Sequence, residues 1–237
     1  MGDTRSGAVP SPAWRQLNQE IVSCRACPRL VEHRERVARE KRRQFRDCEY
    51  WGKPLPGFGD PNARVVLVGL APAAHGGNRT GRMFTGDRSG DWLFEALHRA
   101  GFANQTLSRD RGDGLRLADA YITAAARCAP PNNKPSRAEI EQCRGYLVRE
   151  IGLLQRVRVV VVLGRIGMDA YLAARAAAGL SVPRPKPAFG HGMTHWLGDV
   201  ALVASYHPSQ QNTQTGRLTR PMFARVFRMV RDLLDER

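Results

Sequence analysis

The sequence lacks any apolar run long enough to cross a bilayer, and its first residues carry glycine, proline and charge instead of an apolar signal core. A membrane-spanning helix needs about 20 mostly apolar residues, and a secretory signal needs an apolar stretch of about 7–15. We therefore expect neither a membrane protein nor an exported one, and the cytoplasm is the expected compartment. With 42% hydrophobic residues among 237, the chain can still bury a substantial core.

Acidic residues are also scarce. The chain has 22 Asp and Glu against 37 Lys and Arg, a formal net charge of +15. Such an excess is typical of a protein that binds a polyanion, nucleic acid above all, although a general basic bias that serves solubility is the alternative. Many of the basic residues stand beside Gly, Asn, Thr and Ser, in sequence typical of loops that contact phosphates. This favours a nucleic-acid-binding surface.

A disulfide framework is not expected, because five cysteines occur without an export signal. Cys24 and Cys27 form a CxxC pair, and Cys128 and Cys143 follow about 100 residues later. Four thiolates complete either a tetrahedral zinc site or a four-iron cluster, and the spacing does not decide between these metals. Unrelated buried cysteines are the other interpretation. Cys48 has no partner in this scheme and is interpreted as a free or buried thiol.

Four short apolar runs are rich in β-branched residues and end in glycine, proline or a polar cluster. Runs that are apolar on both faces predict strands of a parallel sheet with helices on each side. They are Val65–Leu70, Tyr121–Ala126, Arg158–Leu163 and Val200–Ser205.

Helical patterns lie before, between and after these runs. Ser136 followed by Glu139 predicts a capping box, and Gly101 and Gly179 predict helix ends. The predicted helices are about Pro12–Ile21, Gly90–Ala100, Ser136–Glu150, Ile166–Ala178 and Pro221–Leu234.

Strands that alternate with helices predict an α/β fold, a three-layer α/β/α sandwich around a central four-stranded parallel sheet. We expect a single domain over residues 1–237, with about residues 1–12 flexible. The basic stretch Glu32–Trp51 is either a charged helix or a loop over the core.

Three polar segments follow the predicted strands, at the sheet edge where parallel sheets bind ligands. They read GLAPAAHGGNRTGRMFTGD after the first strand, CAPPNNKP after the second and SYHPSQQNTQTGRLTRP after the fourth. Together with the cysteines they resemble the family 5 (type B) uracil-DNA glycosylases, an iron-sulfur branch of the uracil-DNA glycosylase superfamily, from Cys24 to the final helix. The resemblance implies excision of uracil from DNA in base excision repair. It also implies a 4Fe-4S cluster, in place of zinc, on Cys24, Cys27, Cys128 and Cys143.

The resemblance also implies roles for single residues in base binding. The enzyme must flip the damaged nucleotide out of the duplex, and Phe84 matches the aromatic residue that stacks on the flipped base. Gly69 and Ala71 complete the predicted base-binding set. His207 matches the donor that stabilises negative charge on the departing base. Without the resemblance, Phe84 would equally be a core residue and His207 a structural histidine.

Activation of the attacking water departs from the better-known relatives. Family 4 enzymes have an acidic residue where this chain has Leu70-Ala71. Asp87 and Asn133 match the positions to which family 5 catalysis is attributed. Asp87 can alternatively cap the helix that follows it.

The residues expected to recognise the base also differ from those of other superfamily members. Thr123-Ala124-Ala125 stand where several superfamily members have an asparagine that reads the uracil edge. We therefore expect relaxed specificity, with activity on uracil and on other deaminated bases such as hypoxanthine. No lysine is placed by a matching motif to form a Schiff base, so the enzyme should be monofunctional and leave an abasic site.

Polar and basic side chains around these motifs are predicted to contact DNA. Superfamily members insert the segment after His-Pro-Ser into the minor groove, and arginines hold phosphates without reading sequence. For the segment after His-Pro-Ser, a plain surface loop is the alternative interpretation. The predicted DNA-binding residues are Ser209, Gln210, Gln211, Asn212, Arg79, Arg82, Arg217 and Arg220.

Two other classes of protein fit part of the sequence. A nonenzymatic, zinc-stabilised nucleic-acid-binding protein accounts for the charge and the cysteines, but not for polar motifs at several strand ends. A small iron-sulfur electron carrier accounts for the cysteines but not for the net charge of +15. We expect a monomer, since one lesion needs one pocket and no dimerisation pattern is visible.

Overall fold

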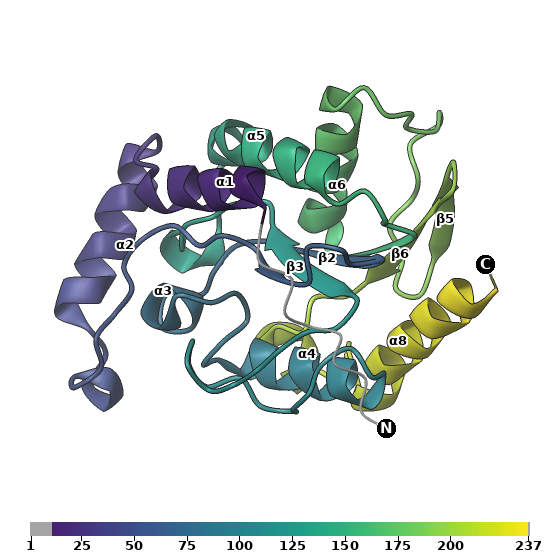
Figure 1. The fold of residues 1–237 in the computed structure, drawn as a ribbon. Helices are drawn as coiled ribbons and strands as arrows, with labels where there is room; N and C mark the ends of the chain where they lie inside the picture. Colours follow the sequence, from purple (N-terminus) through teal and green to yellow (C-terminus); the bar gives the residue numbers. More distant parts are fainter. Residues whose placement is uncertain (1–10, 237) are drawn as a thin grey trace.

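A computed structural model describes residues 11–236 as one mixed sheet between two layers of helices (Figure 1). The strand order is β1-β3-β2-β4-β6-β5. Strands β3 (Ala120–Ala124), β2 (Val65–Gly69), β4 (Val159–Leu163) and β6 (Val200–Ser205) run parallel, which confirms the four predicted strands and the three-layer α/β class.

The sheet has six strands and not four. Strand β1 (Phe58–Gly59) pairs antiparallel with β3, and β5 (Thr194–Leu197) pairs antiparallel with β6. Both lie at the edges, and except for Leu197 their side chains are exposed or half-buried, so neither forms the buried apolar run by which the four central strands were predicted.

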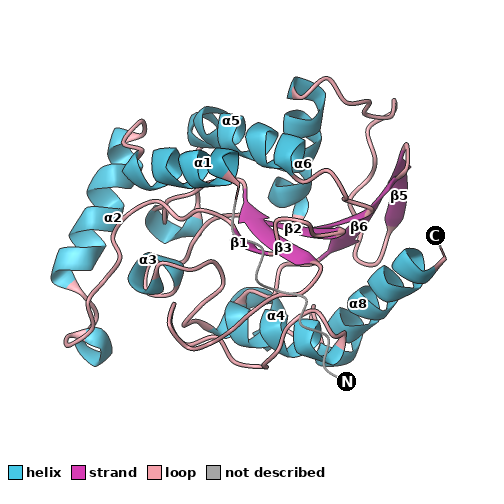
Figure 2. Cartoon of the chain, viewed as in Figure 1, coloured by secondary structure: helices cyan, strands magenta, loops and turns pink. Residues whose placement is uncertain are grey.

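Helices cover both faces of the sheet (Figure 2), and each central strand divides its side chains between these two layers. Val65 and Leu67 of β2 pack with α4 (Arg88–Arg99) and α8 (Arg220–Asp235) on one face. Val66 and Val68 pack on the other face with helices α1 (Pro12–Ser23), α5 (Arg137–Leu153) and α6 (Arg165–Ala177). Burial on both faces explains the absence of polar alternation in these strands.

The predicted helices are all present, with ends shifted by a few residues. The capping box is confirmed, because Ser136 accepts from the Glu139 backbone while the Glu139 side chain accepts from the Ser136 backbone. Ser11 caps α1, so residues 11 and 12 belong to a helix start, and the rest of the segment predicted to be flexible, residues 1–10, lies outside the described residues.

The basic stretch Glu32–Trp51 is part helix and part loop, so each of the two predicted alternatives holds for part of it. Its first half is α2 (Pro28–Glu40), and η1 (Arg43–Phe45) and a loop follow. Short helices complete the fold at the ends of the central strands: α3 (Gly77–Thr80), η2 (Pro131–Asn133) and α7 (Gln210–Gln214). In the part of the chain that the structure describes, no helix is long and apolar enough to cross a membrane.

Candidate active site and cysteine cluster

The loops after β2 and β6 bring two aromatic rings together at the carboxyl edge of the sheet. The Phe84 ring lies stacked on the His207 imidazole, with centroids 5.7 Å apart and planes 29° apart. Gly69, the last residue of β2, lies directly against Phe84, because a Cβ there would be 3.0 Å from the ring. The sequence therefore needs glycine at position 69 for the ring to come this close to the strand end.

The Phe84 backbone has an unusual conformation. Its φ of 51° lies in the left-handed region, which costs free energy for a bulky residue. The start of α4 holds this conformation: a Cβ at Gly90 would lie 1.9 Å from the Phe84 carbonyl oxygen, so only glycine fits there. A strained backbone held by its surroundings is a common property of ligand-binding positions.

His207 lies half-buried at the end of β6. Removal from water lowers the pKa of its imidazole to about 4, so the ring is neutral at physiological pH. Asn212 Nδ2 donates to the His207 carbonyl oxygen at 2.9 Å and fixes the backbone from the following helix. A neutral ring still has one N–H to donate, which suits a group that must stabilise an anion without competing as an acid.

Asp87 is the N-cap of α4. Its Oδ1 accepts from the Gly90 backbone at 3.0 Å, which confirms the capping role that the sequence allowed. Burial raises the pKa of this carboxyl, although backbone hydrogen bonds from Gly90 and Ser89 oppose the shift. Gly76 lies against the same carboxylate, since a Cβ there would be 2.0 Å from Asp87 Oδ2. Capping and a second role in catalysis do not exclude each other.

Asn133 lies in η2, after β3, with an exposed side chain and a φ of 55°. Its neighbour Asn132 also has a positive φ, so two consecutive left-handed residues turn this loop outward. Ala71 is half-buried two residues beyond the end of β2. Both residues are thus at the carboxyl edge, as predicted, while their functional roles stay predictions.

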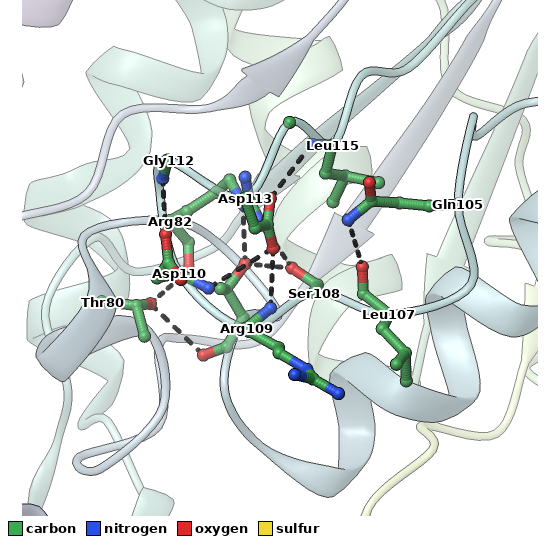
Figure 3. A network of polar contacts seen from close by, with 12 residues as sticks. Thr80, Arg82, Gln105, Leu107, Ser108, Arg109, Asp110, Gly112, Asp113 and Leu115 are labelled. Carbon is green, nitrogen blue, oxygen red and sulfur yellow. Dashed lines mark hydrogen bonds and ion pairs between the residues drawn. The ribbon is translucent and has the colours of Figure 1, made fainter.

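The structure corrects the assignment of Arg82 as a phosphate contact. Its side chain is only 4% exposed, and Nη2 donates to both carboxylate oxygens of Asp113 (Figure 3). Burial alone would raise the pKa of Asp113, but hydrogen bonds from Arg82 and the backbone lower it to about 2. Arg82 also contacts Ser108 Oγ at 2.8 Å, so it holds the loop after β2 to the loop before β3. A guanidinium buried in this way cannot reach a DNA phosphate.

The other three predicted arginines lie on aromatic rings. Arg79 covers Phe45 with its guanidinium carbon 4.1 Å from the ring centroid, and it also donates to two carbonyls of its own loop. Arg217 is exposed and lies 4.6 Å above Tyr206. Arg220 lies over Trp92 and pairs with Glu95. Of these, Arg217 has the most freely exposed charge.

The predicted minor-groove segment is mostly the short helix α7. Ser209 is its N-cap and accepts from Asn212 N, so these two side chains are used within the segment. Gln210 and Gln211 are exposed on its first turn. The two glutamines are therefore the members of this group that project from the edge.

Thr123, which stands where an asparagine base reader was expected, points away from that edge. Its Oγ1 donates to Glu150 Oε2 at 2.6 Å, within a buried network in which Arg127 and Tyr121 also donate to Glu150. Sequence reasoning missed this network, because its members come from β3, the loop after it and α5. The residues that follow in β3 and its loop, residues 124–126, are alanines.

The four cysteines of the predicted cluster come from the junction of α1 and α2, the loop after β3, and α5. Cys24 ends α1, Cys27 begins α2, Cys128 follows β3, and Cys143 lies on the buried face of α5. Burial raises the pKa of Cys128 to about 12 and raises that of Cys143 and Cys27, and charges on the neighbouring thiols add to each shift. The thiols are thus electrostatic neighbours.

Two buried arginines flank these thiols. Arg34 Nη1 donates to Cys128 Sγ at 3.0 Å, and the Arg127 backbone donates to Cys143. The Nε atoms of Arg34 and of Arg127 are buried without a hydrogen-bond partner. Two buried and two half-buried thiols beside unpartnered donors fit an anionic, sulfur-rich group. Among residues 11–236, no three Cys, His, Asp or Glu side chains are arranged as ligands of a single ion.

Comparison with known proteins decides the family. The model of the uracil DNA glycosylase superfamily matches residues 56–231, which include every carboxyl-edge loop described above. The type-5 uracil-DNA glycosylase of Mycobacterium tuberculosis is 52% identical over 92% of this chain and 81% of its own length.

The chain belongs to the type-5 branch of the uracil-DNA glycosylase superfamily.

Two further relatives place it within the superfamily. The type-5 uracil-DNA glycosylase of Thermus thermophilus is 52% identical over 88% of this chain and 93% of its own length. A type-4 uracil-DNA glycosylase of Pyrobaculum aerophilum is 32% identical over 82% of each chain. The higher identity to type-5 proteins agrees with the family that the motifs resemble.

Proposed function

We propose that this chain is a monofunctional DNA glycosylase that excises uracil from DNA and leaves an abasic site. The observation that carries the proposal is the pair formed by Phe84 and His207, a π surface beside a neutral donor at the carboxyl edge of the sheet. The names of the type-5 relatives support uracil as the base and DNA as the partner. The net charge of +15 supports a polyanionic substrate.

The chemistry assigns each residue a distinct task. The flipped uracil stacks on Phe84, which holds its glycosidic bond at the edge of the sheet. Cleavage leaves negative charge on the departing base, and the neutral His207 imidazole donates its N–H toward that charge. Asp87 and Asn133 orient the water that attacks the anomeric carbon from the opposite side.

Base selectivity is proposed to be relaxed, so that hypoxanthine is also excised. The side-chain hydroxyl of Thr123, one residue before the end of β3, is held by Glu150. The alanines at 124–126 that follow contribute no side-chain hydrogen bonds to a base edge. A pocket that reads a base by stacking and shape discriminates less sharply than one that pairs with the edge, since no buried polar group is left unpaired by the wrong base.

The four cysteines are proposed to hold a 4Fe-4S cluster. Cys24, Cys27, Cys128 and Cys143 would each supply one thiolate, which is the ligand set such clusters take. Because every ligand position is then filled by protein, the cluster would stabilise the fold and supply no open coordination position to the reaction. It would join α1 and α2 to the loop after β3, in which Asn133 lies.

An excision assay tests the glycosylase. Duplex DNA with one uracil, or one hypoxanthine, and an end label is incubated with the protein and then treated with alkali, which cleaves at abasic sites. We expect alkali-dependent strand cleavage with both bases and none without alkali. Cleavage without alkali would contradict the monofunctional mechanism, and cleavage of uracil DNA alone would contradict the relaxed pocket.

His207→Ala is the control for that assay, with its unfolding midpoint measured in parallel. Excision by the parent chain no greater than by a folded His207→Ala protein would refute the enzymatic function and favour a nonenzymatic DNA-binding protein.

A metal assay on the purified protein tests the cluster. We expect broad visible absorbance and equal amounts of iron and acid-labile sulfide, whereas a colourless protein with zinc would refute the iron-sulfur assignment. Cys128→Ala should lower stability first and excision as a consequence. Cys48→Ser, at a half-exposed position after η1, should leave the iron content unchanged.

A further inference from the structure

Arg34 is a buried cation whose hydrogen bonds go to the cysteine region. Only 2% of the residue is exposed. Nη1 donates to Cys128 Sγ at 3.0 Å, and Nη1 and Nη2 each lie 3.2 Å from the Cys24 carbonyl oxygen. One guanidinium thus contacts a cysteine from each of two segments that are far apart in the sequence.

The charge of Arg34 is not taken up by a close carboxylate. Its ion-pair partner is Glu35, at 3.7 Å, and both Glu35 oxygens already accept from Arg25. Arg127 differs, because its guanidinium forms a two-pronged pair with the fully buried Glu150, with a closest distance of 2.5 Å. Of the two buried arginines beside the thiols, Arg34 is the one whose positive charge is directed at sulfur.

The backbone of Arg34 is held independently of its side chain. Asn78 Nδ2 donates to the Arg34 carbonyl oxygen at 3.1 Å, and Asn78 is fully buried in α3. Leu30 and Val31, one turn earlier on α2, are buried as well. A change in the side chain at position 34 should therefore leave α2 in place.

We infer that Arg34 is the positioning residue of the proposed cluster: its guanidinium fixes Cys128 and offsets the negative charge on sulfur, and it thereby sets the reduction potential and the lifetime of the cluster. The inference rests on the proposed 4Fe-4S group. Hydrogen bonds to the sulfurs and nearby net charge are among the main determinants of cluster potential. A cation close to sulfur favours the more negative, reduced state, so Arg34 raises the potential.

The unpartnered Nε of Arg34 supports the same assignment. A buried N–H without an acceptor is unfavourable, because folding has removed its hydrogen bonds to water. The atom lies on a guanidinium that already contacts Cys128, so the sulfur atoms of a cluster held there would offer it an acceptor. Outer partners of metal ligands typically change metal affinity by about 10–100-fold when they are removed.

The test compares Arg34→Met with Arg34→Lys and with Arg39→Met, a matched control on the exposed side of the same helix. Methionine keeps the length of the apolar stem and removes charge and donors. Three quantities are measured: iron and sulfide content, the half-life of the visible absorbance in air, and the reduction potential of the cluster.

Arg34→Met should shift the potential to more negative values and shorten the half-life about 10-fold or more. Arg34→Lys should lie between Arg34→Met and the parent, because a lysine keeps the charge and loses the fork. Arg39→Met should match the parent. A potential and half-life of Arg34→Met equal to those of the parent would overturn the inference.

Two other outcomes are separable. If Arg34→Met does not fold, Arg34→Lys decides, and an unchanged potential and half-life in that variant overturn the inference. If the parent chain itself lacks iron, both the cofactor proposal and the role of Arg34 are refuted. If the parent contains the cluster and the Arg34 variants have the same potential and half-life as the parent, only the role of Arg34 is refuted.

Discussion

Phe84 and His207 face each other across the carboxyl edge of the sheet, with ring centroids 5.7 Å apart, although they follow strands β2 and β6, which are not neighbours. Strand β4 lies between them. The contact therefore depends on both loops folding back over β4. The proposed stacking residue and the proposed donor are thus held next to each other by two separate strands.

Phe84→Ala should reduce excision of uracil by weakening base stacking. The lost stacking is worth about 1–3 kcal/mol, which corresponds to roughly 5–150-fold in affinity for the flipped state. Steady-state kinetics and the unfolding midpoint would be measured together. Because the Phe84 ring is only partly buried, the midpoint should fall less than for a fully buried core phenylalanine. Unchanged kinetics would contradict the base-stacking role.

Asp87 permits a separation of capping from catalysis. Asparagine caps helices about as well as aspartate, whereas alanine at an N-cap costs about 1 kcal/mol. Asp87→Asn should therefore keep the unfolding free energy of the parent and lose excision rate, and Asp87→Ala should lose both. An Asp87→Asn protein as active as the parent would show that the carboxylate serves α4 alone.

The depressed pKa of His207 predicts a pH dependence of stability. The unfolded histidine binds a proton near pH 6.5, while the folded one does so only near pH 4. Between these values the unfolded state holds more protons, so the free energy of unfolding should decrease as the pH is lowered from 6.5 to 4. Urea unfolding at several pH values would show this slope. His207→Gln should flatten it, and an equal slope in both proteins would contradict a His207 imidazole whose pKa is lowered by folding.

Arg82 and Arg217 should behave in opposite ways. Arg82→Ala breaks a buried ion pair with Asp113 and should cost about 3–5 kcal/mol of stability, without changing how DNA affinity depends on salt. Arg217→Ala removes an exposed charge and should weaken DNA binding, lowering the salt slope by about one while the unfolding midpoint stays the same. Binding titrations at several salt concentrations distinguish the two. An Arg82→Ala effect on the salt slope alone would restore its predicted phosphate role.

Glu150 should be among the most sensitive positions in the fold. Its carboxylate accepts from Arg127, Tyr121 and Thr123 and is fully buried. Glu150→Gln leaves the Arg127 charge buried and unpaired, which should cost about 3–5 kcal/mol. Glu141→Gln, at an exposed position of the same helix, is the control and should change stability little. Similar losses for the two variants would argue against a special role for the buried pair.

The central architecture was predictable because buried strands and helix starts each leave a pattern within one short segment of sequence. Strands with both faces covered appear as continuous apolar runs, and a capping box appears as Ser136 and Glu139 three residues apart. The edge strands β1 and β5 could not be found in this way. Their pairing is determined by the backbone of the neighbouring strand, and most of their own side chains stay partly exposed.

The site was predictable as a set of motifs but not as a set of contacts. The motif that contains Arg82 resembles a DNA-facing loop. Asp113, the ion-pair partner of Arg82, lies in a different loop, so no local sequence pattern predicts the pair. Arg34 stood in a run of exposed charges and proved to be buried. Thr123 stands where relatives have a base-reading asparagine, whereas its hydroxyl donates to Glu150 of α5. Each of these differences comes from a hydrogen bond or ion pair between polar side chains that are far apart in the sequence.

The contact between α1 and α5 has a consequence for the order of events during synthesis. Helices α1 and α2 leave the ribosome before α5, but α1 is held by α5 through packing and through the Glu20–Arg149 pair. At about 5–20 residues per second, α5 follows with a delay on the order of ten seconds. During that interval Cys24 and Cys27 are exposed without Cys128 and Cys143. A nascent chain of this protein should therefore be most vulnerable to thiol oxidation before its middle has been made.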